Sequence, residues 1–168
     1  MNRPDPLGLE SQSQDHRSPG LVSDDERICR GGFDPMHYAK GKPKNSIIRA
    51  DDLLTGSLSV WRGGVGSQVD FDLAVFEIAK SAPAGQSLKS VFAPNASEIR
   101  DIQLGEPGRV FYVVDDCATD GEGGHHVLHA GIRICPQLKI ESKEDDRFLQ
   151  AKSHLLRVLK KTEISVAA

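Results

Sequence analysis

The sequence lacks long apolar runs, paired cysteines and any strong excess of charge, and each absence excludes a class of protein. No apolar stretch approaches the ~20 residues that a membrane-spanning helix needs, and residues 1–18 contain no signal-peptide core. The three cysteines, Cys29, Cys117 and Cys135, form no CxxC pair. This favours reduced thiols that pack as small core residues. We therefore expect a cytoplasmic protein without membrane contact.

The charge balance and the missing catalytic signatures narrow the functional classes further. The chain has 21 basic and 24 acidic residues, for a formal net charge of -3. It has no global electrostatic reason to coat nucleic acid, although a local basic site is compatible with this balance. The sequence contains no GxSxG motif, P-loop, Rossmann glycine fingerprint or HExxH motif. The well-known signatures therefore assign no activity.

The length and local composition predict one folded domain with two short tails. Residues 1–25 are rich in proline, serine, aspartate and glutamine, so they bury too little apolar surface to order and are expected to be a disordered tail. Residues 26–162 are expected to form a single α+β domain. Residues 163–168 are expected to be a short flexible tail.

Hydrophobic periodicity predicts a mainly antiparallel sheet with a C-terminal amphipathic helix packed on it. Strands are predicted at 57–62, 87–93 and 109–116, with 125–134 as the antiparallel neighbour of the last. Helices are predicted at 70–80, with Asp70 as N-cap, at 95–102, with Asn95 as N-cap, and at 143–161. The apolar stripe of the last helix comprises Phe148, Leu149, Leu155, Leu156 and Leu159.

Three histidines lie close together in "GGHHVLHAGIRIC", residues 123–135. In a strand, His125 and His129 would stand roughly 13 Å apart, which is too far for one tetrahedral metal ion, and His126 would point the opposite way. We therefore expect no metal site. His129 would lie on the strand face opposite the core. Two interpretations stay open for it: a half-buried histidine bonded to the backbone, or a side chain that faces a cleft.

Residues 27–49 form a basic cluster in an otherwise acidic chain. Its cations are Arg27, Arg30, Lys40, Lys42, Lys44 and Arg49. Glycines and prolines in the same stretch predict loop conformations. Such a loop could hold a phosphate, a nucleotide or a nucleic-acid backbone. The alternative is a solvated basic loop that balances the acidic residues at 24–26.

The motifs "RGGFDPMHY", "SLSVWR", "YVVDD" and "HVLHAGI" occur in this order between residues 27 and 134. In this order the chain resembles a group of short uncharacterised bacterial proteins that carry an Arg/His-Pro loop, a Leu-Ser-Val strand and a late His-Ala-x-Ile segment. The resemblance implies functional positions at His37, Ser59, Arg62 and His129, and it implies no activity.

A second resemblance is to ADP-ribosyltransferase-type toxins, which use an arginine, a serine-bearing strand and a glutamate. Arg30, Ser59 and Glu77 follow that order. The tyrosine usual near the serine strand is missing, and Glu77 falls within a predicted helix, which puts this resemblance in doubt.

These observations favour a small bacterial enzyme that acts on a phosphoester or nucleotide. His37 and His129 are the predicted general acid–base pair, because imidazoles titrate near neutrality. Arg30, Lys44 and Arg62 are predicted to bind the phosphate and its developing charge. No cofactor and no metal are expected for this reaction.

Two other functional classes stay open. The chain could be a non-catalytic binding or accessory module of a defence or toxin–antitoxin system, with a protein partner on the terminal helix or the N-terminal tail. It could also transfer ADP-ribose from NAD. A nucleotide or a nucleic acid is a possible partner in the enzyme hypothesis.

Overall fold

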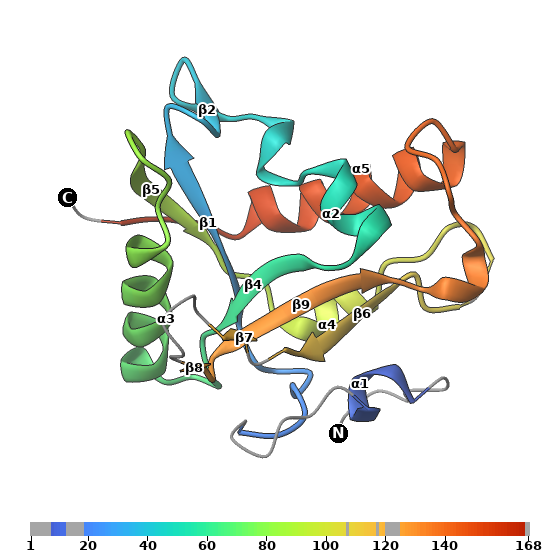
Figure 1. Ribbon diagram of the computed structural model, residues 1–168, viewed down its shortest axis with the longest axis horizontal. Helices are drawn as coiled ribbons and strands as arrows, with labels where there is room; N and C mark the ends of the chain where they lie inside the picture. The colour runs from blue at the N-terminus through green and yellow to red at the C-terminus, as the bar shows by residue number, and fades with distance from the viewer. Residues whose placement is uncertain (1–7, 13–18, 107, 117, 120–124, 167–168) are drawn as a thin grey trace.

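The computed structural model describes residues 8–12, 19–106, 108–116, 118–119 and 125–166, which fold around a six-stranded sheet (Figure 1). The strand order is β10-β5-β1-β4-β9-β6, and every neighbouring pair is antiparallel. The strands are β1 (Ile28–Asp34), β4 (Leu58–Arg62), β5 (Ser87–Phe92), β6 (Phe111–Asp115), β9 (His129–Ile134) and β10 (Glu163–Ser165). The predicted α+β class with a mainly antiparallel sheet is confirmed.

The remaining elements are short, apart from two helices. The longer helices are α3 (Gln68–Lys80) and α5 (Asp146–Lys161). The short elements are α1 (Leu9–Gln12), β2 (Tyr38–Ala39), β3 (Lys42–Pro43), η1 (Asn45–Ile47), α2 (Ala50–Thr55), α4 (Ala96–Arg100), β7 (Ala118–Thr119), β8 (His125–His126) and η2 (Pro136–Leu138).

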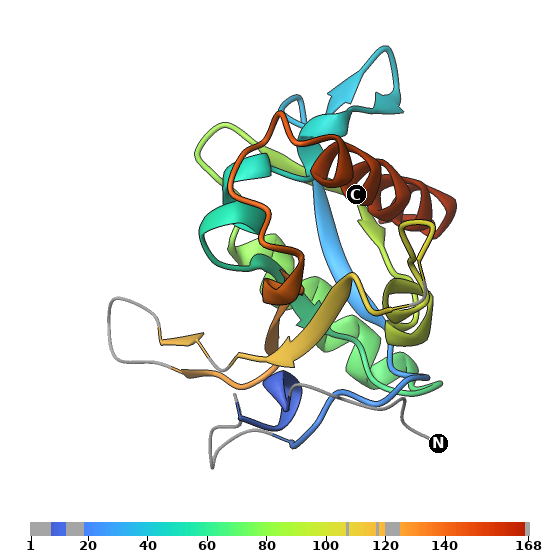
Figure 2. The same cartoon turned by 90° about the vertical axis from the view of Figure 1, so that its right-hand side faces the viewer.

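The two faces of the sheet carry separate apolar cores. Helix α5 packs on one face, together with α2 and α4, and buries Phe148, Leu155, Leu156 and Leu159 there. Helix α3 covers the other face through Phe71, Ala74 and Ile78. Figures 1 and 2 show the two long helices on opposite sides of β1. The predicted packing of the C-terminal helix on the sheet is confirmed.

The helix boundaries follow local capping chemistry. The predicted cap of α4 is confirmed, since Asn95 and Glu98 form a capping box. The prediction for α3 is wrong at its start, because Ser67 is the N-cap and accepts the backbone N–H of Asp70. In α5, Leu149 departs from the predicted stripe and is 50% exposed.

The basic stretch 27–49 contains a central strand where a loop was predicted. Strand β1 lies between β4 and β5, and its two glycines permit close packing on both faces. A Cβ atom at Gly31 would lie 2.5 Å from Ile78, and one at Gly32 would lie 2.7 Å from the Tyr38 hydroxyl. The glycines therefore serve packing within the sheet.

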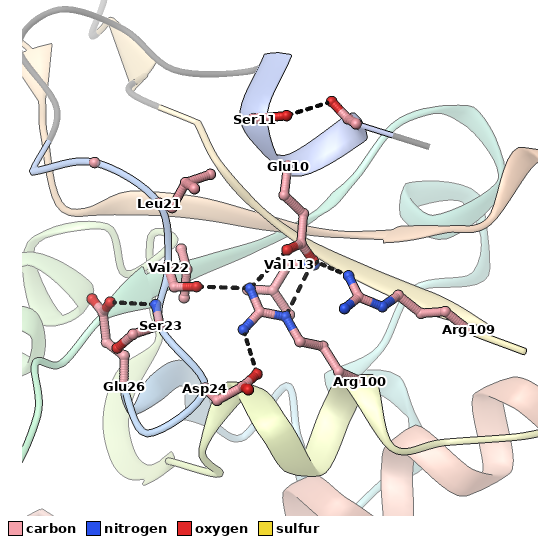
Figure 3. A network of polar contacts seen from close by, with 12 residues as sticks. Glu10, Ser11, Leu21, Val22, Ser23, Asp24, Glu26, Arg100, Arg109 and Val113 are labelled. Carbon is pink, nitrogen blue, oxygen red and sulfur yellow. Dashed lines mark hydrogen bonds and ion pairs between the residues drawn. The ribbon is translucent and has the colours of Figure 1, made fainter. Parts of the chain in front are cut away.

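The N-terminal residues that the structure describes are not a tail. Glu10 is 5% exposed and Val22 is 2% exposed. The Glu10 carboxylate accepts hydrogen bonds from Arg100, from Arg109 and from the backbone N–H of Val113 (Figure 3). The predicted tail therefore includes a segment that covers the open edge of β6. Residues 1–7 and 13–18 lie outside the described residues.

The C-terminal end also differs from the prediction. Residues 163–165 form β10, which pairs with β5 at the other edge of the sheet. The flexible tail expected at 163–168 is therefore not found at 163–166, and residues 167–168 lie outside the described residues.

Among the described residues, no helix is long and apolar enough to cross a membrane.

Candidate functional site

A serine and a histidine meet on adjacent strands of the sheet. Ser59 lies on β4 and His129 on β9, and Ser59 Oγ is 2.5 Å from His129 Nε2. The register places Ser59 opposite Gly131 and Trp61 opposite His129, so all four side-chain positions share one face of the sheet. Gly131 has no side chain, and the hydroxyl of Ser57 occupies the space where a Cβ atom would lie.

The hydrogen bonds around His129 define its tautomer. His129 Nδ1 lies 2.6 Å from the backbone carbonyl of Asp116, which can only accept a hydrogen bond. Nδ1 therefore carries a proton, and in its neutral form the ring presents the lone pair of Nε2 to the Ser59 hydroxyl. This is the tautomer that can remove a proton from Ser59.

Two further side chains fix the position of the His129 ring. The Asp116 carboxylate oxygen Oδ2 lies 3.9 Å from Nδ1, where it would stabilise a positively charged ring. The Trp61 ring meets the imidazole edge-on, with centroids 5.3 Å apart. The His129 side chain is 12% exposed, so it is shielded from bulk water without being closed off.

Arg30 contacts the same serine through the main chain. Its Nη1 donates to the Ser59 carbonyl at 2.8 Å, and its Nε donates to the Ile47 carbonyl at 3.1 Å. Among the described residues, Arg30 has no ion-pair partner. Burial lowers the pKa of Arg30, the charge of Asp52 raises it, and that of Arg49 lowers it. Arg30 is thus a cation held in place by two carbonyl groups.

Arg30 lines a cavity of about 420 Å³ at the end of β1. The other lining residues are Phe33, Met36, His37, Ser46, Arg49, Asp52, Ser81 and Pro83. Two guanidinium groups and one carboxylate give this cavity a net positive charge, which suits an anionic group of modest size.

His37 lines the same cavity but is held by the backbone. It is 4% exposed, and its Nδ1 accepts the backbone N–H of Phe33 at 3.1 Å. Burial, together with the charges of Arg30 and Lys44, lowers the pKa of His37 to about 4, against the opposing effect of a hydrogen bond to the Gly31 backbone. His37 is therefore neutral near pH 7 and already bonded, which does not fit the predicted acid–base role.

The structure does not bring His37 and His129 together. His129 lies opposite Trp61, which lies opposite Cys29 near the start of β1. His37 contacts Phe33, four residues further along β1, or roughly 13 Å at ~3.3 Å per residue. The two histidines are also separated sideways by the width of β4. A two-histidine site across one phosphate is not formed.

The two remaining predicted phosphate ligands have different surroundings. Arg62 is 4% exposed and makes a bidentate ion pair with Glu26, at 2.7 and 2.8 Å. It also donates to backbone carbonyls at Gly20 and Leu21, so it anchors the segment before β1 and is not available to a ligand. Lys44 is exposed beside η1.

Of the three residues that the ADP-ribosyltransferase resemblance implies, two lie together in the structure. Arg30 and Ser59 are in contact. Glu77 lies on α3 and pairs with Lys80 at 3.5 Å.

The structure forms no group of three or more potential metal ligands among the residues it describes. His125 and His126 form β8, but their side chains lie outside the described residues, as does Cys117. Burial raises the pKa of Cys29 to about 12, so this thiol has the inert core character expected of it.

Asp116 is the member of the site that sequence reasoning missed as a partner of His129. It closes the motif "YVVDD" at the end of β6, directly across from the start of β9. The predicted antiparallel pairing of 109–116 with 125–134 was the signal in the sequence that could have placed Asp116 beside His129.

Neither a protein-family model, nor a curated protein, nor a solved structure matches this chain. The geometry of the site therefore carries the functional interpretation.

Proposed function

We propose that the protein is an enzyme that acts on a phosphoester, with Ser59 as nucleophile and His129 as its base. The observation that carries the proposal is the hydrogen bond between Ser59 Oγ and His129 Nε2, in a ring whose proton is held at Nδ1 by Asp116. Serine nucleophiles are activated by a neighbouring base that a third group holds in orientation, and Ser59, His129 and Asp116 form this arrangement. This proposal keeps the predicted substrate class and replaces His37 with Ser59.

The chemistry proceeds in two balanced steps. Ser59 Oγ attacks phosphorus while His129 Nε2 takes the hydroxyl proton, so an O–P bond forms and the bond to the leaving oxygen breaks. The protonated ring then returns its proton to the leaving alkoxide. In the second step Nε2 removes a proton from water, whose oxygen attacks phosphorus. The bond between Ser59 Oγ and phosphorus breaks, and the protonated ring returns its proton to Ser59 Oγ, which restores both side chains.

The phosphoester class is supported by a cationic cavity near the strand that carries Ser59. Arg30 binds the main chain of Ser59 and lines a cavity with a second arginine, Arg49. The cavity borders the main chain of β4, whereas the Ser59 hydroxyl lies on the other face of the sheet from the Arg30 side chain. Arginine suits phosphate binding because its fixed fork of donors matches phosphate oxygens.

Covalent labelling of Ser59 by an aryl fluorophosphonate tests the proposal, because the reagent marks activated serines by losing fluoride. We expect a phosphonyl adduct on Ser59 in the wild-type protein, located by peptide mass spectrometry. His129→Gln should lower the labelling rate by about 100-fold or more, the usual contribution of a general base. Ser57→Ala is the matched control and should label at the wild-type rate.

Hydrolysis of bis(p-nitrophenyl) phosphate then tests the substrate class separately from the activation of Ser59. Ser59→Ala should remove the release of p-nitrophenolate. An unlabelled Ser59, or equal labelling in His129→Gln, would overturn the proposed nucleophile. Labelling without hydrolysis of any phosphoester probe would overturn the substrate class.

A further inference from the structure

Helix α5 presents a groove whose charged lining is entirely positive. The groove encloses about 700 Å³ between α5 and η1, and it is lined by Asn45, Leu149, Lys152, Ser153, Leu156, Arg157, Lys160 and Lys161. No carboxylate belongs to this lining. Leu149, the one residue of the predicted apolar stripe that is half exposed, lies in the groove.

The cations follow two adjacent rows along the helix. Lys152 and Lys160 lie in the row that contains Leu156, and Arg157 and Lys161 lie in the row that contains Ser153, with a spacing of four residues in each. From Lys152 to Lys160 the row spans roughly 12 Å at ~1.5 Å per residue. The cations thus form a linear array along the helix, which matches the regularly spaced charges of a linear polyanion.

The basic hairpin of β2 and β3 lies near this groove. Lys160 Nζ donates to Asn45 Oδ1 at 2.9 Å, which joins the end of α5 to the segment that follows the hairpin. Lys40, Lys42 and Lys44 are all exposed on or beside that hairpin. In Figures 1 and 2 the hairpin stands at the end of β1 and lies above α5.

Four cations line the groove, which is here called the α5 basic face: Lys152, Arg157, Lys160 and Lys161. Three more, Lys40, Lys42 and Lys44, are exposed on or beside the neighbouring hairpin, which makes seven basic residues in this region. Within the described part of the chain, none of the seven forms an ion pair. The helix dipole accounts for Lys160 and Lys161 in the last turn, but not for the other five. Mutual repulsion among these unpaired cations would be relieved by a bound polyanion.

We propose that the α5 basic face binds the phosphate backbone of a nucleic acid. The groove lining contains no aromatic ring on which bases could stack, so binding rests on phosphate contacts and is independent of base sequence. The face lies on the side of the sheet opposite the Ser59 side chain, and the proposal stands independently of the proposed enzyme activity.

Fluorescence anisotropy with labelled oligothymidylate, and with a labelled duplex of the same length, tests this inference on the full chain. We expect both probes to bind at about 50 mM salt, and affinity to fall steeply towards about 200 mM. Lys152→Gln combined with Arg157→Gln should weaken binding about tenfold. It should also reduce the slope of log K against log salt by about 0.9 per lost contact on duplex and about 0.7 on single strand.

The matched control removes two exposed lysines outside the groove, Lys139→Gln combined with Lys143→Gln, and changes the net charge equally. It should bind like the wild type. If both double variants weakened binding equally, the effect would come from net charge alone and the proposed binding site would be wrong. The absence of binding at low salt would also contradict the proposal. Ser59→Ala should leave binding unchanged, so failure here and failure of the proposed enzyme are distinguishable.

Discussion

Glu10 and Arg100 stand 90 positions apart in the chain and form a buried ion pair, with Glu10 Oε2 at 2.9 Å from Arg100 Nη2 (Figure 3). The same carboxylate accepts from Arg109 at 2.8 Å. The arginine side chains are 2% and 8% exposed. One glutamate near the N-terminus therefore pairs with two buried cations at the edge of the sheet, and Asp24 supplies a second carboxylate to Arg100 at 2.9 Å.

Glu10→Ala should destabilise the fold strongly. It leaves Arg100, Arg109 and the Val113 N–H without the carboxylate, and removing one partner of a buried pair costs about 3–5 kcal/mol. Urea unfolding followed by tryptophan fluorescence measures the loss. Ser11→Ala, at an exposed neighbouring position, should change stability by less than about 0.5 kcal/mol. Equal stability of the two variants would mean that α1 does not hold the edge.

His37 should make stability depend on pH below neutrality. Its pKa of about 4 in the folded protein is below the 6.5 of an ordinary histidine, so the unfolded chain binds the proton more tightly. Its contribution is fully present above pH 6.5 and is lost as the pH falls towards 4, by on the order of 3 kcal/mol. Unfolding midpoints of the wild type and of His37→Gln across this window should converge at low pH. His154→Gln should keep the wild-type dependence.

Gly31→Ala should destabilise through overpacking against α3. The added Cβ atom would lie 2.5 Å from Ile78, which is 1% exposed. We expect a loss of about 1–3 kcal/mol in thermal or chemical unfolding. Adding Ile78→Ala should make the cost of Gly31→Ala much smaller than in the wild-type background. Independent, additive effects would contradict this contact.

Two leucines of α5 should respond differently to the same substitution. Leu155 is fully buried, so Leu155→Ala should cost about 2–5 kcal/mol. Leu149 is 50% exposed in the groove, so Leu149→Ala should cost less than about 0.5 kcal/mol. Chemical denaturation of both variants makes the comparison. A large loss at Leu149 would mean that this side chain packs within the domain.

Inorganic phosphate should stabilise the protein through the cavity beside Arg30. A ligand at about 100 times its Kd adds about 2.7 kcal/mol to folding, and the melting temperature rises accordingly. Arg49→Gln, an exposed position that lines the cavity, should reduce this rise by half or more. Lys80→Gln, on α3, should retain it. The same rise in all three proteins would place phosphate elsewhere.

Local signals predicted the elements that local chemistry controls. The capping box of Asn95 and Glu98, and the amphipathic repeat of α5, depend on residues within a few positions of one another. Strand β1 was not predicted because two adjacent glycines, Gly31 and Gly32, are typical of a loop. Glycine is needed at these positions because Ile78, Tyr38 and Phe92 approach the backbone closely, and these contacts exist only in the folded chain.

The candidate site was predicted in its parts but not in its arrangement. His129 was placed on the strand face opposite the core, and Ser59 was singled out within its strand. Their contact depends on β4 lying beside β9, 70 positions away in the chain, and no local pattern encodes that neighbour. Glu10 was missed for a related reason, because one glutamate in a polar segment does not indicate two arginines some 90 positions later.

The sheet order has consequences for folding kinetics. Strand β1 pairs with β5, β4 with β9, and β5 with β10, so most of the pairing joins segments that are distant in the chain. Each such pairing requires a large loop to close before its contacts contribute, and domains of high contact order fold in milliseconds to seconds. A nascent chain that has not yet exposed β9 and β10 would lack two of the six strands, and β4 and β5 would each have an unpaired side open to association with other chains.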